Sequence, residues 1–235
     1  MRPTLRLTRL VAPVLALSLS VGAVVASGAG AVSAQSSASA TSTTAAAAAT
    51  LPAGFANRLA LRNAMGKLWE DHITWTRLYV VDALADAPEL PQTTQRLLQN
   101  QVDIGNAIKP FYGDAAGDQL TSLLNSHILI AADLVAAAKQ GDSVALTTNM
   151  GRWQGNANQI ADFLSAANPD NWPQDEMRAM MRQHLDLTTA EVVARLNKDW
   201  AGDVAAYDKV HEHILMLADQ LTEGLVNQFP DQFAA

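Results

Sequence analysis

Cysteine is absent from the 235-residue chain. Its absence excludes disulfide bonds, zinc sites built from thiolates, cysteine nucleophiles and covalent attachment of c-type haem through Cys-x-x-Cys-His. The fold must therefore be held by its hydrophobic core, to which a bound ligand could add stability.

Charged residues are absent from Leu10 to Ala34, and Leu10 to Ala26 is strongly apolar. Small residues at 31–34 occupy the positions that a signal peptidase reads. The basic residues that precede the apolar stretch are Arg2, Arg6 and Arg9. This pattern predicts a secretory signal peptide over residues 1–34. We therefore expect a mature chain that is exported and is periplasmic, cell-surface or extracellular.

An uncleaved membrane anchor is the competing interpretation, because the apolar stretch is nearly long enough to span a bilayer. Pro13 and the Gly/Ser/Ala-rich second half of the stretch favour cleavage, which leaves no membrane span. The segment after the cleavage site, 35–54, is low in complexity, with Ser, Thr and Ala dominating it. It has too little apolar surface to offset the entropy of ordering, so it is predicted to be a flexible leader.

Basic residues are scarce in the predicted mature chain. Removing the three arginines of the predicted signal peptide leaves 13 basic residues against 23 acidic ones, a net charge of −10 with His neutral. Such an acidic protein is a poor candidate for binding nucleic acid or anionic lipid through a basic face.

No alternating strand pattern occurs, whereas apolar residues recur at helical spacing throughout residues 55–230. This predicts a single all-α domain, a bundle of about six antiparallel helices built as three repeated hairpins, and a C-terminal tail at 231–235. The turns within hairpins are expected near Asp86, Asp142 and Asp199, and the links between hairpins near Tyr112 and Asn171.

The first, third and fifth predicted helices each carry a histidine, and the three histidines recur at similar spacing. His72, His127 and His184 are separated by 55 and 57 residues, which indicates an internal repeat. Each histidine lies 28 or 29 residues before a second polar residue, with the turn near the middle of the interval. These second residues are Asn100, Asn156 and His213.

Residues equally far from the turn of a helical hairpin lie at the same height. The spacing therefore predicts three structural polar pairs: His72 with Asn100, His127 with Asn156, and His184 with His213. A buried polar group needs such a partner.

Metal binding is the alternative use of His72, His127, His184 and His213, because helical bundles build metal and haem sites from facing helices. The usual local signatures, Glu-x-x-His and His-Glu-x-x-His, are missing. A metal or non-covalent haem at these histidines is therefore a hypothesis that rests on convergence alone.

Sequence motifs for catalysis are also missing, including Gly-x-Ser-x-Gly. Asp103, Asp133 and Glu191 lie on or near the apolar stripes and could serve acid–base chemistry, but acids flanking a surface are the more common case. Trp75 and Trp153 are similarly expected in the core more than in a ligand pocket.

Several runs, among them LWEDHITWTRLYVVDAL, RLLQNQVDIGNAIKPFYG and HILIAADLVAAAKQGD, resemble an uncharacterised family of bacterial all-helical proteins. The resemblance covers about residues 61–230. Family members carry the labels glycosyltransferase and acetylglutamate kinase, yet this chain lacks the strand–helix alternation and Gly-rich phosphate loop that such enzymes need. The resemblance implies a shared fold and supplies no catalytic residues.

Two function classes follow from the sequence. The first is an exported noncatalytic protein that binds a partner protein or a small ligand. The second is a metal- or haem-binding helical bundle that uses the inward histidines. An enzyme that uses no metal is a third class, which the residues favour less than the other two.

Overall fold

The computed structural model describes residues 53–234. The predicted signal peptide, its cleavage site and most of the predicted leader lie outside the described residues. Within 53–234 the chain forms six α-helices, a short 3-10 helix and no strands, so the protein is all-α as predicted. The helices are α1 (Ala53–Ala85), α2 (Leu90–Tyr112), α3 (Asp114–Gln140), α4 (Ser143–Ala167), α5 (Gln174–Leu196), α6 (Trp200–Gln228) and η1 (Pro230–Phe233).

The helices end where the sequence predicts turns, and side chains cap two of the new starts. Asp142 accepts hydrogen bonds from the backbone amides of Val144 and Ala145, and Asp199 accepts one from Gly202. An aspartate at this position satisfies amides that the first turn of a helix cannot pair internally. The longest connection between helices is 168–173, which contains the predicted link at Asn171.

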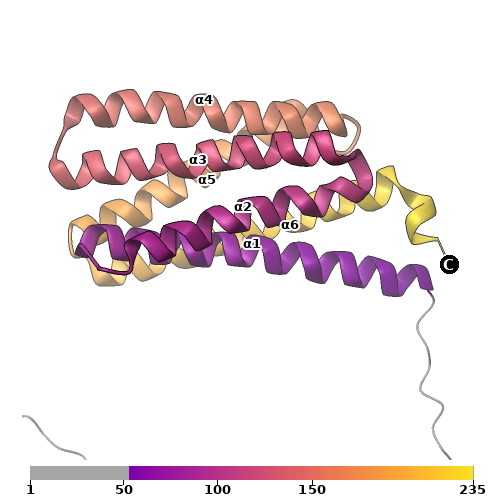
Figure 1. The fold of residues 1–235 in the computed structure, drawn as a ribbon, viewed down its shortest axis with the longest axis horizontal. Coiled ribbons are helices and arrows are strands. Elements are labelled where there is room, and N and C mark those ends of the chain that lie inside the picture. Colours follow the sequence, from indigo (N-terminus) through magenta and orange to yellow (C-terminus); the bar gives the residue numbers. More distant parts are fainter. Residues whose placement is uncertain (1–52, 235) are drawn as a thin grey trace, which may run out of the picture. The chain divides into compact units, whose positions relative to one another are not determined.

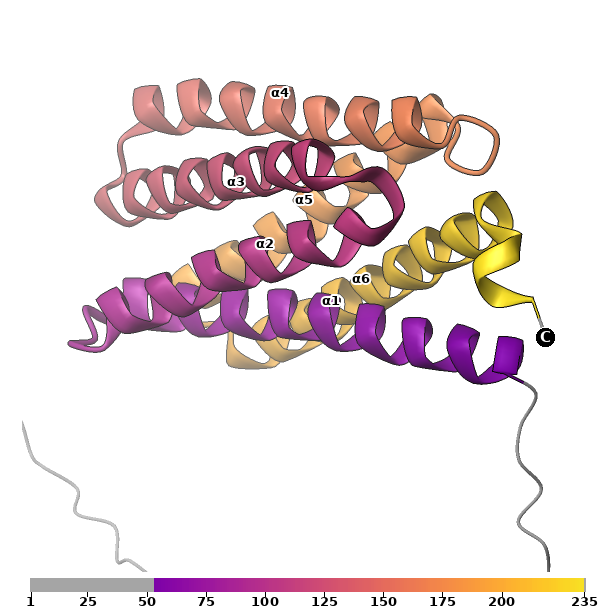
Figure 2. The same cartoon turned by 45° about the vertical axis from the view of Figure 1, so that its right-hand side comes forward.

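Each helix packs against the next one in the chain, and α6 returns to pack against α1 (Figure 1). Rotation of the view shows α6 running behind α1 towards η1, which lies beside the first turn of α1 (Figure 2). The contact between α2 and α3 is as extensive as the contact within any expected hairpin. Helix contacts alone therefore do not single out three hairpins, and that grouping stays a prediction.

The core is one continuous apolar cluster to which all six helices contribute. It is closed at one end by aromatic rings, whose members are Phe111, Tyr112, Trp172, Phe229 and Phe233. These rings come from the last turn of α2, the α4–α5 link and the segment after α6, so they hold together the segments at that end.

Both boundaries predicted for the domain need correction. Phe233 is only 6% exposed and stacks on Phe111, so 231–233 is packed structure and not a tail. Helix α1 begins at Ala53, inside the predicted leader, and the Asn57 side chain donates a hydrogen bond to the Gln232 carbonyl. The first turn of α1 is ordered because the C-terminal segment packs against it, a long-range contact that local composition does not reveal.

By length and composition, α3 is apolar enough to cross a bilayer. A core helix meets the same criterion, and α3 contributes Leu120, Leu124, Ile128 and Leu134 to the buried interior.

Gly224 of α6 lies directly beneath the Trp172 ring. A Cβ atom at position 224 would lie 2.0 Å from Trp172 Nε1, so Gly224→Ala should displace the indole and lower the free energy of unfolding by about 1–3 kcal/mol. Gly155→Ala is the matched control, because it also lies within a helix but meets nothing within 4 Å. It should stabilise the protein by about 0.5–1 kcal/mol through helix propensity. Equal effects of the two changes in urea unfolding would contradict this packing.

Candidate functional site

Four histidines from four helices gather inside the bundle. His72 of α1, His127 of α3, His184 of α5 and His213 of α6 are each no more than 4% exposed. His184 is the centre of this histidine cluster, with ring centroids 5.9 Å from His72 and 6.2 Å from both His127 and His213. The fifth histidine, His211, lies outside the cluster, with its Nε2 2.9 Å from Glu70 Oε1.

The predicted pair of His127 and Asn156 is confirmed. His127 Nδ1 lies 2.8 Å from Asn156 Oδ1, and Asn156 Nδ2 donates to the Leu123 carbonyl at 3.0 Å. Because the amide nitrogen of Asn156 is engaged by a carbonyl, its oxygen faces the ring and accepts from Nδ1–H. The hydrogen-bond arrangement therefore assigns the proton of neutral His127 to Nδ1.

The predicted partner of His72, Asn100, shares its place beside the ring with a second buried amide, Gln101. The side chain nearest to His72 Nδ1 is Gln101, whose Nε2 lies 3.4 Å away. Asn100 is fully buried as expected, but its Nδ2 donates to the Leu68 carbonyl on α1 at 2.9 Å. Asn100 therefore also bonds the facing backbone, and the longer Gln101 side chain makes the second amide contact with the ring.

The predicted pairing of His184 with His213 needs a different correction. The two rings lie parallel within 16°, so they face each other as expected. The hydrogen bond of His213, however, runs from Nε2 to the Met180 carbonyl at 3.0 Å. The two rings therefore make a stacking contact, and a backbone carbonyl satisfies the donor.

A common register emerges from these contacts. On each even-numbered helix, one polar side chain donates to a backbone carbonyl of the preceding helix. That carbonyl lies four residues before the cluster histidine of the preceding helix. The donors are Asn100, Asn156 and His213. The acceptors are the carbonyls of Leu68, Leu123 and Met180. Each contact joins two consecutive helices at the same height relative to the histidine cluster.

Burial keeps the cluster uncharged. It lowers the pKa of His72 to about 3, with a contribution from neighbouring His127, and it lowers the pKa of His127 to about 4. The pKa of His184 is lowered well below its usual value by burial and then by the other three histidines, and burial lowers that of His213. Charging any imidazole here would place a cation in an apolar interior beside other imidazoles.

Metal binding is the alternative role predicted for the histidine cluster. Across residues 53–234, no group of three or more His, Asp or Glu side chains is placed to hold a metal ion. Metal or non-covalent haem at these four histidines stays a prediction.

A buried ion-pair network, which sequence reasoning missed, joins α1, α5 and α6. Arg77 contacts Glu191 at 2.7 Å and both carboxylate oxygens of Asp203 at 3.0 Å, and Arg195 contacts Asp203 at 2.8 Å. The Glu191 and Asp203 side chains are 1% and 3% exposed. Burial raises the pKa of Glu191; burial also opposes ionisation of Asp203, but the two guanidinium groups hold its pKa below the usual range.

The other candidate acids are likewise engaged by neighbours. Asp103 accepts a hydrogen bond from Gln99, and Asp133 forms an exposed ion pair with Arg152. The three candidates lie on different helices, and Glu191 serves the ion-pair network. Their contacts describe structural roles.

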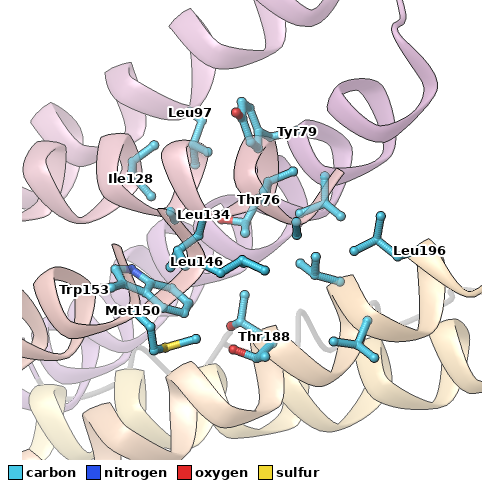
Figure 3. Close-up of a pocket in the computed structure, with 17 residues that line it drawn as sticks. Thr76, Tyr79, Leu97, Ile128, Leu134, Leu146, Met150, Trp153, Thr188 and Leu196 are labelled. Carbon is cyan, nitrogen blue, oxygen red and sulfur yellow. The ribbon is translucent and has the colours of Figure 1, made fainter. Parts of the chain in front are cut away.

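An apolar cavity of about 110 Å³ lies between α1, α3, α4 and α5, with Leu97 of α2 in its wall (Figure 3). Two of the threonine hydroxyl groups in its wall are already bonded. Thr76 donates to the His72 carbonyl at 2.7 Å, and Thr188 donates to the His184 carbonyl at 2.8 Å. The surface that the cavity presents to an occupant is therefore almost entirely hydrocarbon.

The cavity shares its wall with the histidine cluster. Thr76, Ala131 and Thr188 lie one helical turn beyond His72, His127 and His184, and all three line the cavity. Trp153 lies between the two features, since it lines the cavity and its ring centroid is 5.2 Å from that of His127.

Of the two tryptophans predicted to lie in the core, one is buried and the other is half-buried. Trp153 is 4% exposed, so it is a core residue as expected, but it is also part of a pocket. Trp75 is only half-buried and lies under the Arg96 guanidinium at 5.1 Å.

Comparison with protein-family models, curated proteins and solved structures finds no match to this chain. The functional argument therefore depends on the geometry described above.

The buried histidines predict acid sensitivity. Because their pKa values are lowered on folding, their contribution to stability is complete above the unfolded value of about 6.5 and is lost as the pH falls towards 4. The free energy of unfolding should fall by about 1.4 kcal/mol per pH unit for each histidine that gains a proton. In urea unfolding, His184→Met should reduce this slope by the contribution of one histidine, about 1.4 kcal/mol per pH unit. A wild-type stability independent of pH in this range would refute the prediction.

Arg77 should be essential to stability because it neutralises two buried carboxylates. Arg77→Ala should lower the free energy of unfolding at pH 7 by about 3–5 kcal/mol. Arg62→Ala, which breaks an ion pair with Asp219 whose side chains are 57% and 52% exposed, should cost under about 1 kcal/mol. The difference between Arg77→Ala and the wild type should shrink as the pH falls, since Glu191 then becomes protonated. Urea titrations at two pH values measure both effects, and equal losses for the two arginines would contradict the network.

Proposed function

We propose that this chain is an exported, noncatalytic protein that binds a small apolar ligand in the cavity between α1, α3, α4 and α5. The observation that carries the proposal is the chemistry of the cavity wall. Its 17 lining residues are aliphatic or aromatic apart from threonines and Tyr79. Pockets of this kind are the usual place for a ligand in a helical bundle.

The size of the cavity supports a small occupant. Its volume of about 110 Å³ is comparable with the dry apolar cavities of about 150 Å³ that are able to hold benzene. An apolar ligand gains from leaving water and meets no buried polar group that it would leave unpaired. A ligand with a hydrogen-bonding group inside the cavity would lose its water and find no partner.

The noncatalytic part of the proposal is supported by the state of the polar groups. Thr76 and Thr188 donate their hydroxyl hydrogens to backbone carbonyls of their own helices, and Glu191 accepts a hydrogen bond from Arg77. None of these contacts leaves an activated nucleophile facing the cavity. Export is supported by the basic, apolar and small-residue order of residues 1–34.

We also infer that the six helices descend from three hairpins of an internal repeat. Support comes from the shared register in which Leu68, Leu123 and Met180 accept hydrogen bonds from the following helix. Each acceptor lies four residues before a cluster histidine.

Filling the cavity tests the function. Benzene and 1-octanol serve as probes, and at least one should raise the unfolding temperature of the mature protein and change Trp153 fluorescence. Ala131→Leu places three further carbon atoms in the cavity and should abolish both effects, because the ligand then has no space. Ala136→Leu is the matched control, since Ala136 lies on α3 but is exposed. The proposal fails if neither probe stabilises the wild type, or if the two variants respond alike.

A further inference from the structure

The cavity has an inner end and a mouth. Val80, Leu97 and Trp153 form buried wall, each no more than 4% exposed. Val193 of α5 also lines the cavity but is 47% exposed, and Leu146 of α4 is half-buried. Apolar lining thus continues from the interior to solvent beside the seam between α4 and α5.

The seam is the weakest contact in the ring of helices. Helices α4 and α5 pack against each other less extensively than any other consecutive pair, and their connection at 168–173 is the longest. A molecule can therefore reach the interior here with less disruption of packing than between other neighbours.

An open mouth favours an elongated occupant over a compact one. A compact hydrocarbon at the inner end would leave Val193 exposed to water, whereas a chain that extends through the mouth would also cover this apolar surface. The polar end of such a chain would stay in solvent and would keep its hydrogen bonds to water, so it would carry no desolvation cost.

Charge near the mouth disfavours an anionic head group. The predicted mature chain has a net charge of −10. Lys139 and Arg152, on the helices that line the cavity, are paired with Asp86 and Asp133. A carboxylate or phosphate head would meet repulsion from the net negative charge of the chain, and Lys139 and Arg152 are already engaged by carboxylates.

Building on the proposed function, we propose that the ligand is an uncharged single-chain amphiphile, whose hydrocarbon tail enters past Val193 into the cavity while its head group remains in water. Acylglycerols with one chain have this chemistry. Fatty acids share the tail but differ in head charge, and compact aromatics share neither feature.

Cysteine protection tests where the chain lies. The natural chain has no cysteine, so Val193→Cys introduces a single thiol at the mouth, and Val204→Cys introduces a matched thiol on α6 at similar exposure, 47% against 54%. Both positions are on the surface, so both variants should fold. Monooctanoylglycerol below its micellar concentration should slow modification of Cys at 193 by a thiol reagent at least about tenfold and leave the 204 variant unchanged. Equal protection at both positions, or none at 193, overturns the proposal.

Chain length and head charge test the ligand class. Affinity for monoacylglycerols should rise about fourfold for each added methylene until the cavity is full. Octanoate at pH 7 should bind at least about tenfold more weakly than monooctanoylglycerol. An affinity independent of chain length, or tighter binding of octanoate, refutes the amphiphile.

The two proposals fail in different ways. If benzene binds and Ala131→Leu abolishes it, but monooctanoylglycerol neither binds nor protects Cys at 193, the cavity is a site for compact hydrocarbons and only the amphiphile is refuted. If no probe binds the wild type, the proposed function fails with it.

Discussion

The bundle depends on hydrogen bonds from buried side chains to backbone carbonyls of the facing helix. Asn100, Asn156 and His213 make this contact at one height in the bundle, each with a carbonyl that already accepts a bond within its own helix. A carbonyl oxygen has two lone pairs, so the second bond satisfies a buried donor without unwinding the helix. The contacts set the sliding register of consecutive helices, which apolar packing alone would specify weakly because one aliphatic layer resembles the next.

The buried polar groups of the interior form two regions, the uncharged histidine cluster and the charged Arg77 network. Around His184 the polar groups are imidazoles and amides, which burial leaves neutral. Two helical turns further along α5, Glu191 is ionisable, and Arg77 supplies the compensating charge. The cavity shares a wall with the histidine cluster, yet its own lining is almost entirely hydrocarbon, because Thr76 and Thr188 donate their hydroxyl hydrogens to backbone carbonyls.

The local sequence pattern was sufficient to predict the helices, but it was insufficient to predict all the hydrogen-bond partners of the buried side chains. The apolar period and the aspartates at helix starts predict six helices and their turns, since both are properties of short segments. His127 with Asn156 could be predicted because a two-residue turn leaves little freedom in the register of α3 and α4. The additional contact of Gln101 with His72 depends on how far α2 lies from α1, a distance that no local pattern encodes.

Longer-range features left no trace in the sequence. Arg77 and Asp203 are 126 residues apart, and either could have belonged to a solvated helix face. The cavity is space left between side chains, so it depends on the tilt of four helices together. The packed Phe233 is a similar case, because its partner Phe111 lies in the last turn of α2, far from it along the chain.

The contact of η1 with the first turn of α1 brings the first and last described segments side by side (Figure 1). Together with the packing of α6 on α1, it makes the ring of helices continuous, with no helix left as an edge. The order of the helices is then cyclic in space, and the starting point of the described chain is one of several equivalent positions. A circular permutant that joins 234 to 53 and opens the chain at Gly141 would retain every helix and every interface of the bundle.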